Sequence, residues 1–144
     1  MINITFPDNS VKQFEKGTTP LQIAESISSR LAQDILAASV NDTQWDITRP
    51  IHDDATIKLF KWDDAEGKHA FWHSSAHLLA EALQELYPGV KFGIGPAIET
   101  GFYYDIDSEV AFTPEALTKL ESEMKKIVKE NLVIERFELP RDEA

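Results

Sequence analysis

The pattern of hydrophobic and polar residues predicts a series of short β-strands in the first 62 residues. Three stretches alternate between apolar and polar side chains, as half-buried strands do: INITF (2–6), VKQFE (11–15) and ATIKLFK (55–61). The apolar stretch ILAASVN (35–41) predicts one more strand, and we expect a second, looser turn between ASVND and TQWDI. The polar segment PDNS (7–10) predicts a hairpin turn, because Pro fixes φ and Asp, Asn and Ser bond their own backbone.

A helical pattern separates these strands after residue 18. Thr19 can cap the helix, with Pro20 at the first helical position and Gln22 three residues after the cap. The apolar residues behind them would form its buried side: Leu21, Ile23, Ala24 and Ile27. The resulting order, β-β-α-β-(β)-β, predicts a small β-grasp (ubiquitin-like) domain over residues 1–62.

The pattern from residue 63 to residue 144 predicts a second, α+β region. The polar DDAEGK (63–68) favours a linker, and the helix expected from His69 to Tyr87 ends at Pro88-Gly89. Glycines among β-formers in VKFGIGPAIETGFYYDID (90–107) predict strands joined by tight turns. A second helix is expected from Thr113-Pro114 to about Leu132, followed by a strand in VIERFEL (133–139). The fold class of the whole chain is therefore α+β.

Composition narrows the classes of protein that this pattern allows. The chain has 144 residues, of which 42% are hydrophobic, as in folded globular proteins. It has no apolar run of about 18 residues, so no membrane span is expected. The N-terminus lacks the basic and long apolar regions of a signal peptide, so we expect a cytoplasmic location. The absence of cysteine excludes disulfides and thiolate chemistry within the chain.

The charge is strongly and unevenly acidic. The formal net charge is −11. Residues 1–62 hold six Lys and Arg against eight Asp and Glu, a net −2, whereas residues 63–144 hold eight against 17, a net −9. Because phosphate contacts need clustered Lys and Arg, bulk charge gives no support for a nucleic-acid partner.

Two histidines four residues apart are the clearest candidates for chemistry. His73 and His77 lie in AFWHSSAHLLAEAL (70–83), where a spacing of four makes them neighbours on one helical face. On a helical wheel this face is opposite the apolar arc that contains Leu79 and Leu83. The pair therefore points away from the core, either into a site or into water.

Three interpretations of the pair remain at this level. A complete zinc site is not expected, since Ser74 stands where the HExxH motif has its glutamate and zinc needs three or four ligands. An acid–base pair is chemically reasonable, because imidazole titrates near neutral pH and could move the proton of a bound water. The third interpretation is that the two histidines form a solvated face without a function. For the segment GIGPAIETGFYYD, the corresponding interpretation without a function is an ordinary strand-turn-strand.

The combination FWHSSAHLLAEAL and GIGPAIETGFYYDID resembles the start of the editing domain of bacterial threonyl-tRNA synthetases. The first 62 residues resemble the small TGS domain that begins those enzymes. The resemblance implies a TGS domain at 1–62 and the first half of an editing domain at 63–144. Such editing domains hydrolyse serine that has been wrongly attached to tRNA(Thr), while a separate catalytic domain charges the tRNA with threonine using ATP.

The resemblance also implies roles for four residues. His73 and His77 match the family's HxxxH motif, which lines the editing pocket, contacts the terminal adenosine or the ester and helps to place the attacking water. Gly95 would let the backbone approach the seryl group, and the Tyr104 hydroxyl could bond the substrate. No metal ligand is implied.

The family's editing cleft is completed by a cysteine-histidine motif that does not occur in this chain. We therefore expect the cleft to be incomplete and the chain alone to be inactive. No cofactor is expected in this region; ATP, Mg and Zn belong to the family's absent catalytic domain. The implied partners are the 3′ end of tRNA(Thr) and the remainder of the synthetase, which would form a homodimer through its C-terminal domains; no membrane partner is expected.

Two other functions remain open from the sequence. The first is a non-catalytic RNA-binding or regulatory module, since TGS domains also occur in GTPases and stringent-response enzymes. The chain has no GxxxxGK[ST] phosphate loop, which a GTPase would need. The second is a free-standing trans-editing deacylase, against which the missing cysteine counts.

Overall fold

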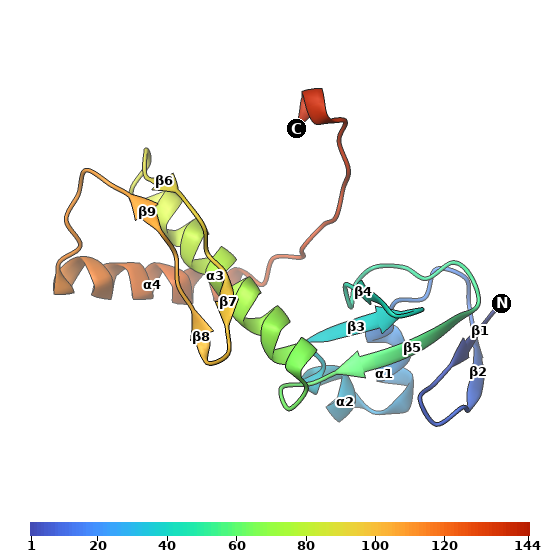
Figure 1. The fold of residues 1–144 in the computed structure, drawn as a ribbon. Coiled ribbons are helices and arrows are strands. Elements are labelled where there is room, and N and C mark those ends of the chain that lie inside the picture. The colour runs from blue at the N-terminus through green and yellow to red at the C-terminus, as the bar shows by residue number, and fades with distance from the viewer. The chain divides into compact units, whose positions relative to one another are not determined.

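A computed structural model describes residues 1–144 and divides them into two compact units. The first unit comprises Met1–Lys61 with Val133–Ala144, and the second comprises Trp62–Leu132. Figure 1 labels the elements of both.

The first unit is built on a five-stranded sheet with the order β2-β1-β5-β3-β4 (Figure 1). Its strands are β1 (Ile2–Thr5), β2 (Val11–Phe14), β3 (Ala37–Val40), β4 (Thr43–Trp45) and β5 (Ala55–Phe60). The central pair β1 and β5 is parallel, and every other pair is antiparallel. The mixed sheet with its crossover helix confirms the predicted β-grasp topology and the α+β class.

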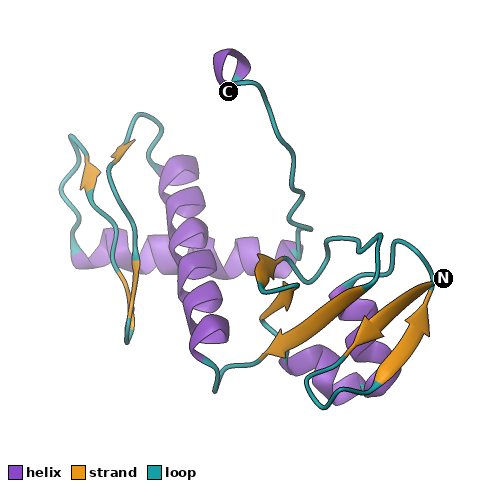
Figure 2. Ribbon diagram, turned by 45° about the vertical axis from the view of Figure 1, so that its right-hand side comes forward, coloured by secondary structure: helices purple, strands orange, loops and turns teal.

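The helix α1 (Pro20–Ile27) begins as the sequence predicts. The Thr19 side chain accepts a hydrogen bond from the Gln22 amide, while the Gln22 side chain accepts one from the Thr19 amide, which completes a capping box. Ile23 of α1 then packs into the core beside Ile4 and Ile57. Figure 2 shows the helices of this unit together on one side of its sheet.

Two features of the first unit differ from the expectations. A second helix, α2 (Ser29–Asp34), was not predicted; the Ser28 hydroxyl caps it by accepting from the Leu31 amide. The turn between β3 and β4 is tight rather than loose. Only Asn41 and Asp42 separate the paired residues, and both have positive φ, as the type I′ hairpin turn requires.

The predicted strand at 133–139 is wrong. Residues 131–140 form neither helix nor strand, and the apolar side chains of Val133, Ile134 and Phe137 are 73–76% exposed. The reason is physical: alternation marks a segment that could join a sheet, but a strand also needs a neighbour to take up its backbone hydrogen bonds. No strand of the described chain pairs with this segment.

The second unit is organised around two helices, α3 (Ala65–Leu86) and α4 (Pro114–Glu130). They pack through Leu83 of α3 and Leu120 and Ile127 of α4, all of which are buried. Helix α4 begins as predicted, with the Thr113 hydroxyl accepting from the Ala116 amide. Helix α3 begins at Ala65, four residues earlier than predicted and inside the expected linker.

No helix of the described chain is both long enough and apolar enough to cross a membrane.

Candidate functional site

Helix α3 presents the two histidines on its exposed side. Its opposite side carries the buried residues Ala76, Ala82 and Leu83, so packing against α4 fixes how the helix is turned. His73 and His77 are both exposed, which confirms that they point away from the core. The packing of the helix's buried residues thus places the pair on its exposed side.

The two imidazoles meet edge to face. Their Nε2 atoms lie 3.0 Å apart, their ring centroids are 4.6 Å apart, and their planes make an angle of 83°. A hydrogen bond between two Nε2 atoms needs one ring to donate Nε2–H and the other to accept with a bare nitrogen. The two side chains therefore share a single proton at this contact, as a pair that relays protons would.

The surroundings of His73 favour its neutral form. Partial burial first, and then the charges that His77 and His69 would carry, lower the pKa of the His73 imidazole. His69 lies one turn before it, with its ring stacked parallel to that of His73 at 6.1 Å. A neutral imidazole can accept a proton from water, so His73 in this form can act as a base.

A long antiparallel hairpin runs along α3 (Figure 1). At the base of the hairpin, β6 (Lys91–Phe92) is paired with β9 (Ile106–Asp107). At its tip, β7 (Ala97–Ile98) is paired with β8 (Gly101–Phe102). Four residues, 93–96, separate the two ladders on the first strand, but only three, 103–105, on the second. One extra residue is therefore inserted as a β-bulge.

The bulge lies opposite Asp105. The Gly93 amide donates to the Asp105 carbonyl at 2.7 Å, and the Asp105 amide donates to the Ile94 carbonyl at 2.8 Å, so two residues of one strand face a single residue of the other. Bulges bend a strand and redirect its side chains, and they are frequent beside active sites. Here the bulge immediately precedes Gly95.

The hairpin brings the other two candidate residues together. A Cβ atom added to Gly95 would lie 2.4 Å from Cδ2 and Cε2 of Tyr104, well inside van der Waals contact. The φ of Gly95 is not in the left-handed region, so the position needs glycine for space and not for its backbone conformation. The Tyr104 ring also packs edge to face on Phe92, with centroids 5.4 Å apart, which fixes its orientation.

The structure therefore forms two pairs, His73 with His77 and Gly95 with Tyr104, in the same unit. No hydrogen bond or ring contact joins one pair to the other. The tip of the hairpin contacts α3 instead through Phe102, whose ring centroid is 6.2 Å from that of Trp72. The roles that the resemblance gives to the four residues stay predictions.

Sequence reasoning missed an aromatic cluster around Trp72. The Trp62 ring makes edge contacts with Phe71 at 5.2 Å and with Trp72 at 5.5 Å, and the Lys68 ammonium lies 5.7 Å from its centroid. The signal was the density of aromatic residues at the start of α3. Through this cluster, Trp62 and the hairpin tip at Phe102 both contact the N-terminal half of α3.

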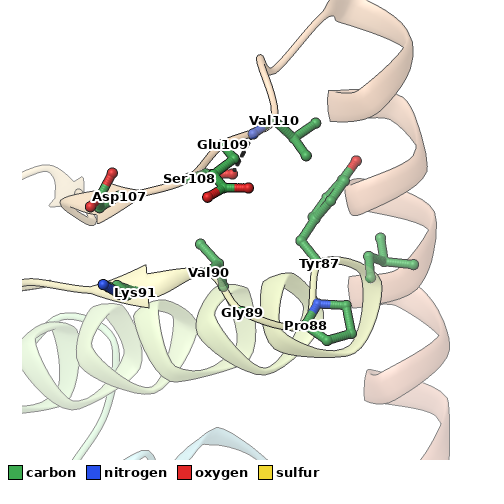
Figure 3. A pocket seen from close by; sticks show the side chains of 10 residues that line it. Tyr87, Pro88, Gly89, Val90, Lys91, Asp107, Ser108, Glu109 and Val110 are labelled. Atoms are coloured by element: carbon green, nitrogen blue, oxygen red, sulfur yellow. Dashed lines mark hydrogen bonds between the residues drawn. The ribbon is translucent and has the colours of Figure 1, made fainter.

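A separate hollow of about 470 Å³ lies at the C-terminal end of α3 (Figure 3). It is lined by Leu86, Tyr87, Pro88, Gly89, Val90, Lys91, Asp107, Ser108, Glu109 and Val110. The one hydrogen bond drawn there is internal, from the Val110 amide to the Ser108 hydroxyl. Its charged side chains are of both signs, so they indicate no particular class of ligand.

Comparison with known proteins finds relatives along the whole chain. Residues 2–61 match the TGS domain family. The chain is 63% identical over 145 aligned positions to a protein of Parabacteroides distasonis named "Threonine--tRNA ligase". Proteins of the same name from Bacteroides fragilis and Cytophaga hutchinsonii are 57% and 52% identical to it. All of this chain is aligned in each case, but it spans only 22% of the length of these relatives.

Proposed function

We propose that the chain is the N-terminal region of a threonine--tRNA ligase, because residues 2–61 match the TGS domain family and the whole chain aligns with proteins of that name. Its second unit would form one wall of the site that hydrolyses Ser-tRNA(Thr). The observation that carries the editing role is the exposed pair of His73 and His77, whose Nε2 atoms lie 3.0 Å apart.

The chemistry that the proposal requires is ester hydrolysis. A water attacks the seryl carbonyl, the bond to the ribose oxygen breaks, and the products are serine and uncharged tRNA. The neutral imidazole of His73 would accept the proton of the attacking water, His77 would hold His73 in position, and the pair would return that proton to the ribose oxygen as it leaves. Tyr104 would bond the substrate from the hairpin, at the point where Gly95 leaves room for it.

An editing site is needed because the charging site discriminates poorly between threonine and the smaller serine. A difference of one methylene changes binding by only about 1–3 kcal/mol, so a site that accepts threonine cannot strongly reject serine. A second site can instead exclude the larger threonine side chain by its size. The close approach of Gly95 to the Tyr104 ring supports a tightly fitted wall of this kind.

The proposal extends to a full-length synthetase, as long as the relatives, of which this chain would be the N-terminal region. That protein would charge tRNA(Thr) with threonine using ATP, Mg and a zinc site in domains outside this chain, and it would dimerise through those domains. Its location would be the cytoplasm, where tRNA is charged. A regulatory module or a free-standing deacylase is less well supported, because the relatives described above carry the ligase name and match both units.

We predict that the 144-residue chain alone hydrolyses Ser-tRNA(Thr) little or not at all, because the cysteine-histidine half of the family's cleft is missing. The measurement compares the chain with a full-length chimera, in which this chain replaces the matching region of the Parabacteroides distasonis protein. The chimera should release serine. Rapid release by the chain alone, abolished by His73→Ala, would show that the cleft is already complete.

A further inference from the structure

One aromatic contact joins the helix of the histidine pair to the hairpin that carries Gly95 and Tyr104. Trp72 of α3 is the residue immediately before His73. Phe102 of β8 lies two residues before Tyr104, and its ring centroid is 6.2 Å from that of Trp72. We propose, on the basis of the editing function above, that Trp72 is a positioning residue: by holding the hairpin tip on α3, it sets the Tyr104 side chain relative to His73.

The hairpin is anchored on the helices at two places. At its base, Phe92 and Ile106 pack against the buried cluster of α3 and α4 that contains Leu83. At its tip, both strands, β7 and β8, contact α3, and Phe102 makes the ring contact to the helix there. The bulge opposite Asp105 lies between these two anchors. Since the base is held by the core of the unit, a change in the tip contact alters the course of the hairpin beyond that core.

The position of the tip is passed along the strand to Tyr104. Phe102 and Tyr104 are both half-buried, whereas Tyr103 between them is 46% exposed. This alternation places the first two rings on the same face of the hairpin. Phe102 pairs with Ala97 in the tip ladder, and a single residue separates that ladder from Tyr104. A displacement of the tip on α3 therefore displaces the Tyr104 ring as well.

On the helix side, the connection to the histidine pair is direct. Trp72 and His73 are successive residues of a regular α-helix, so a ring docked on Trp72 has a defined place along the helix and around it. The Trp72 ring is itself held by edge contacts with Trp62 and Phe71, both at 5.5 Å. Aromatic pairs prefer centroid separations of about 4.5–7 Å, and all the ring contacts of Trp72 fall in this range.

The surroundings of Trp72 separate a positioning role from a purely structural one. Trp72 lies outside the buried cluster around Leu83, and its neighbours Trp62 and Phe71 are 43% and 42% exposed. A smaller side chain at position 72 should therefore leave α3 and α4 packed together, while the hairpin tip loses its aromatic contact. A loss of activity in such a variant would then come from the position of the tip.

The first measurement is amide hydrogen exchange of the 144-residue chain, followed by NMR. The Asp105 amide, which donates to the Ile94 carbonyl, should exchange about 2–10-fold faster in Trp72→Ala, the change that corresponds to the loss of one aromatic pair. Phe71→Ala is the matched control, because it removes a ring of the same cluster that has no ring contact with the hairpin. Unchanged exchange in Trp72→Ala, or equal acceleration in Phe71→Ala, would overturn the proposal.

The second measurement is serine release from Ser-tRNA(Thr) by the full-length chimera. Trp72→Ala should lower kcat about 10–10²-fold, as a misplaced group in a site does, and Trp72→Phe, which keeps a ring, should recover most of the loss. Tyr104→Phe should slow release in the unmodified chimera but have little further effect in Trp72→Ala, because a displaced hydroxyl no longer reaches the substrate. An equal factor in both backgrounds, including no effect in either, would show that Trp72 does not act through Tyr104.

The outcomes also separate this proposal from the editing function. If the unmodified chimera releases no serine, the editing function fails, and with it the positioning role. If the chimera releases serine and Trp72→Ala releases it equally fast, the positioning role alone is overturned. Should Trp72→Ala fail to fold, Phe102→Leu removes the same ring contact from the hairpin side and takes its place in both measurements.

Discussion

Replacing Gly95 by alanine is expected to displace the Tyr104 ring and to slow serine release by the full-length chimera by about 10²-fold, the cost of a misplacement of about 1 Å. The added Cβ would lie 2.4 Å from two atoms of the Tyr104 ring. An aromatic ring cannot bend away as the end of a flexible side chain can. The ring must move as a whole, which disturbs its edge contact with Phe92.

The same substitution should lower the free energy of unfolding of the second unit. Overpacking lowers the free energy of unfolding by about 1–3 kcal/mol. Alanine also reduces the conformational entropy of the unfolded chain, which raises the free energy of unfolding by only about 0.4–1 kcal/mol. The clash therefore outweighs the entropic gain. Denaturant unfolding of the 144-residue chain measures the difference.

A double-mutant cycle identifies the cause. If the clash with the ring is responsible, Gly95→Ala should cost much less stability in a Tyr104→Ala background, since the two residues then no longer touch. An equal cost in both backgrounds would contradict the assignment. Tyr104→Phe keeps the ring and removes the hydroxyl, so its effect on serine release reports the hydroxyl alone.

Replacing His73 by alanine should reduce serine release by the full-length chimera about 10²–10⁴-fold, the usual contribution of a positioned acid–base group. The pKa of this imidazole is lowered by its surroundings, so at neutral pH it is in the form that accepts a proton. The substitution also leaves His77 without the nitrogen with which it shares a proton. First-order loss of serine from pre-charged Ser-tRNA(Thr) measures the effect.

His69→Ala is the matched control for His73→Ala. It removes an imidazole from the same face of α3, but one whose ring is stacked beside His73 without a hydrogen bond and is the smallest of the three causes that lower the pKa of His73. Serine release should stay close to that of the unmodified chimera. Equal losses in the two variants would mean that the face as a whole matters and that the His73–His77 pair has no special role.

Elements with purely local signals could be predicted from the sequence. The capping box of Thr19 and Gln22 involves residues three positions apart, and so does the cap at Thr113, so both helices begin where expected. The Ser28 cap of α2 carried the same kind of signal and was overlooked. The failed strand at 133–139 shows the limit, because its alternation cannot tell whether a pairing strand is present.

The candidate site was predictable only in part for the same reason. A spacing of four residues is enough to place His73 and His77 together on one helical face. The bulge opposite Asp105 depends on how residues 93–96 pair with 103–105, and no local pattern encodes that register. The contact between Gly95 and Tyr104 follows from the bulge, so family resemblance could suggest both residues but could not show that they touch.

The most direct test of the editing proposal is the discrimination between two charged tRNAs by the full-length chimera. Ser-tRNA(Thr) and Thr-tRNA(Thr) are prepared separately, and the release of each amino acid is followed under the same conditions. The proposal predicts fast release of serine and little release of threonine, with serine release lost in His73→Ala. Absence of serine release, or equal release of the two amino acids, would contradict it.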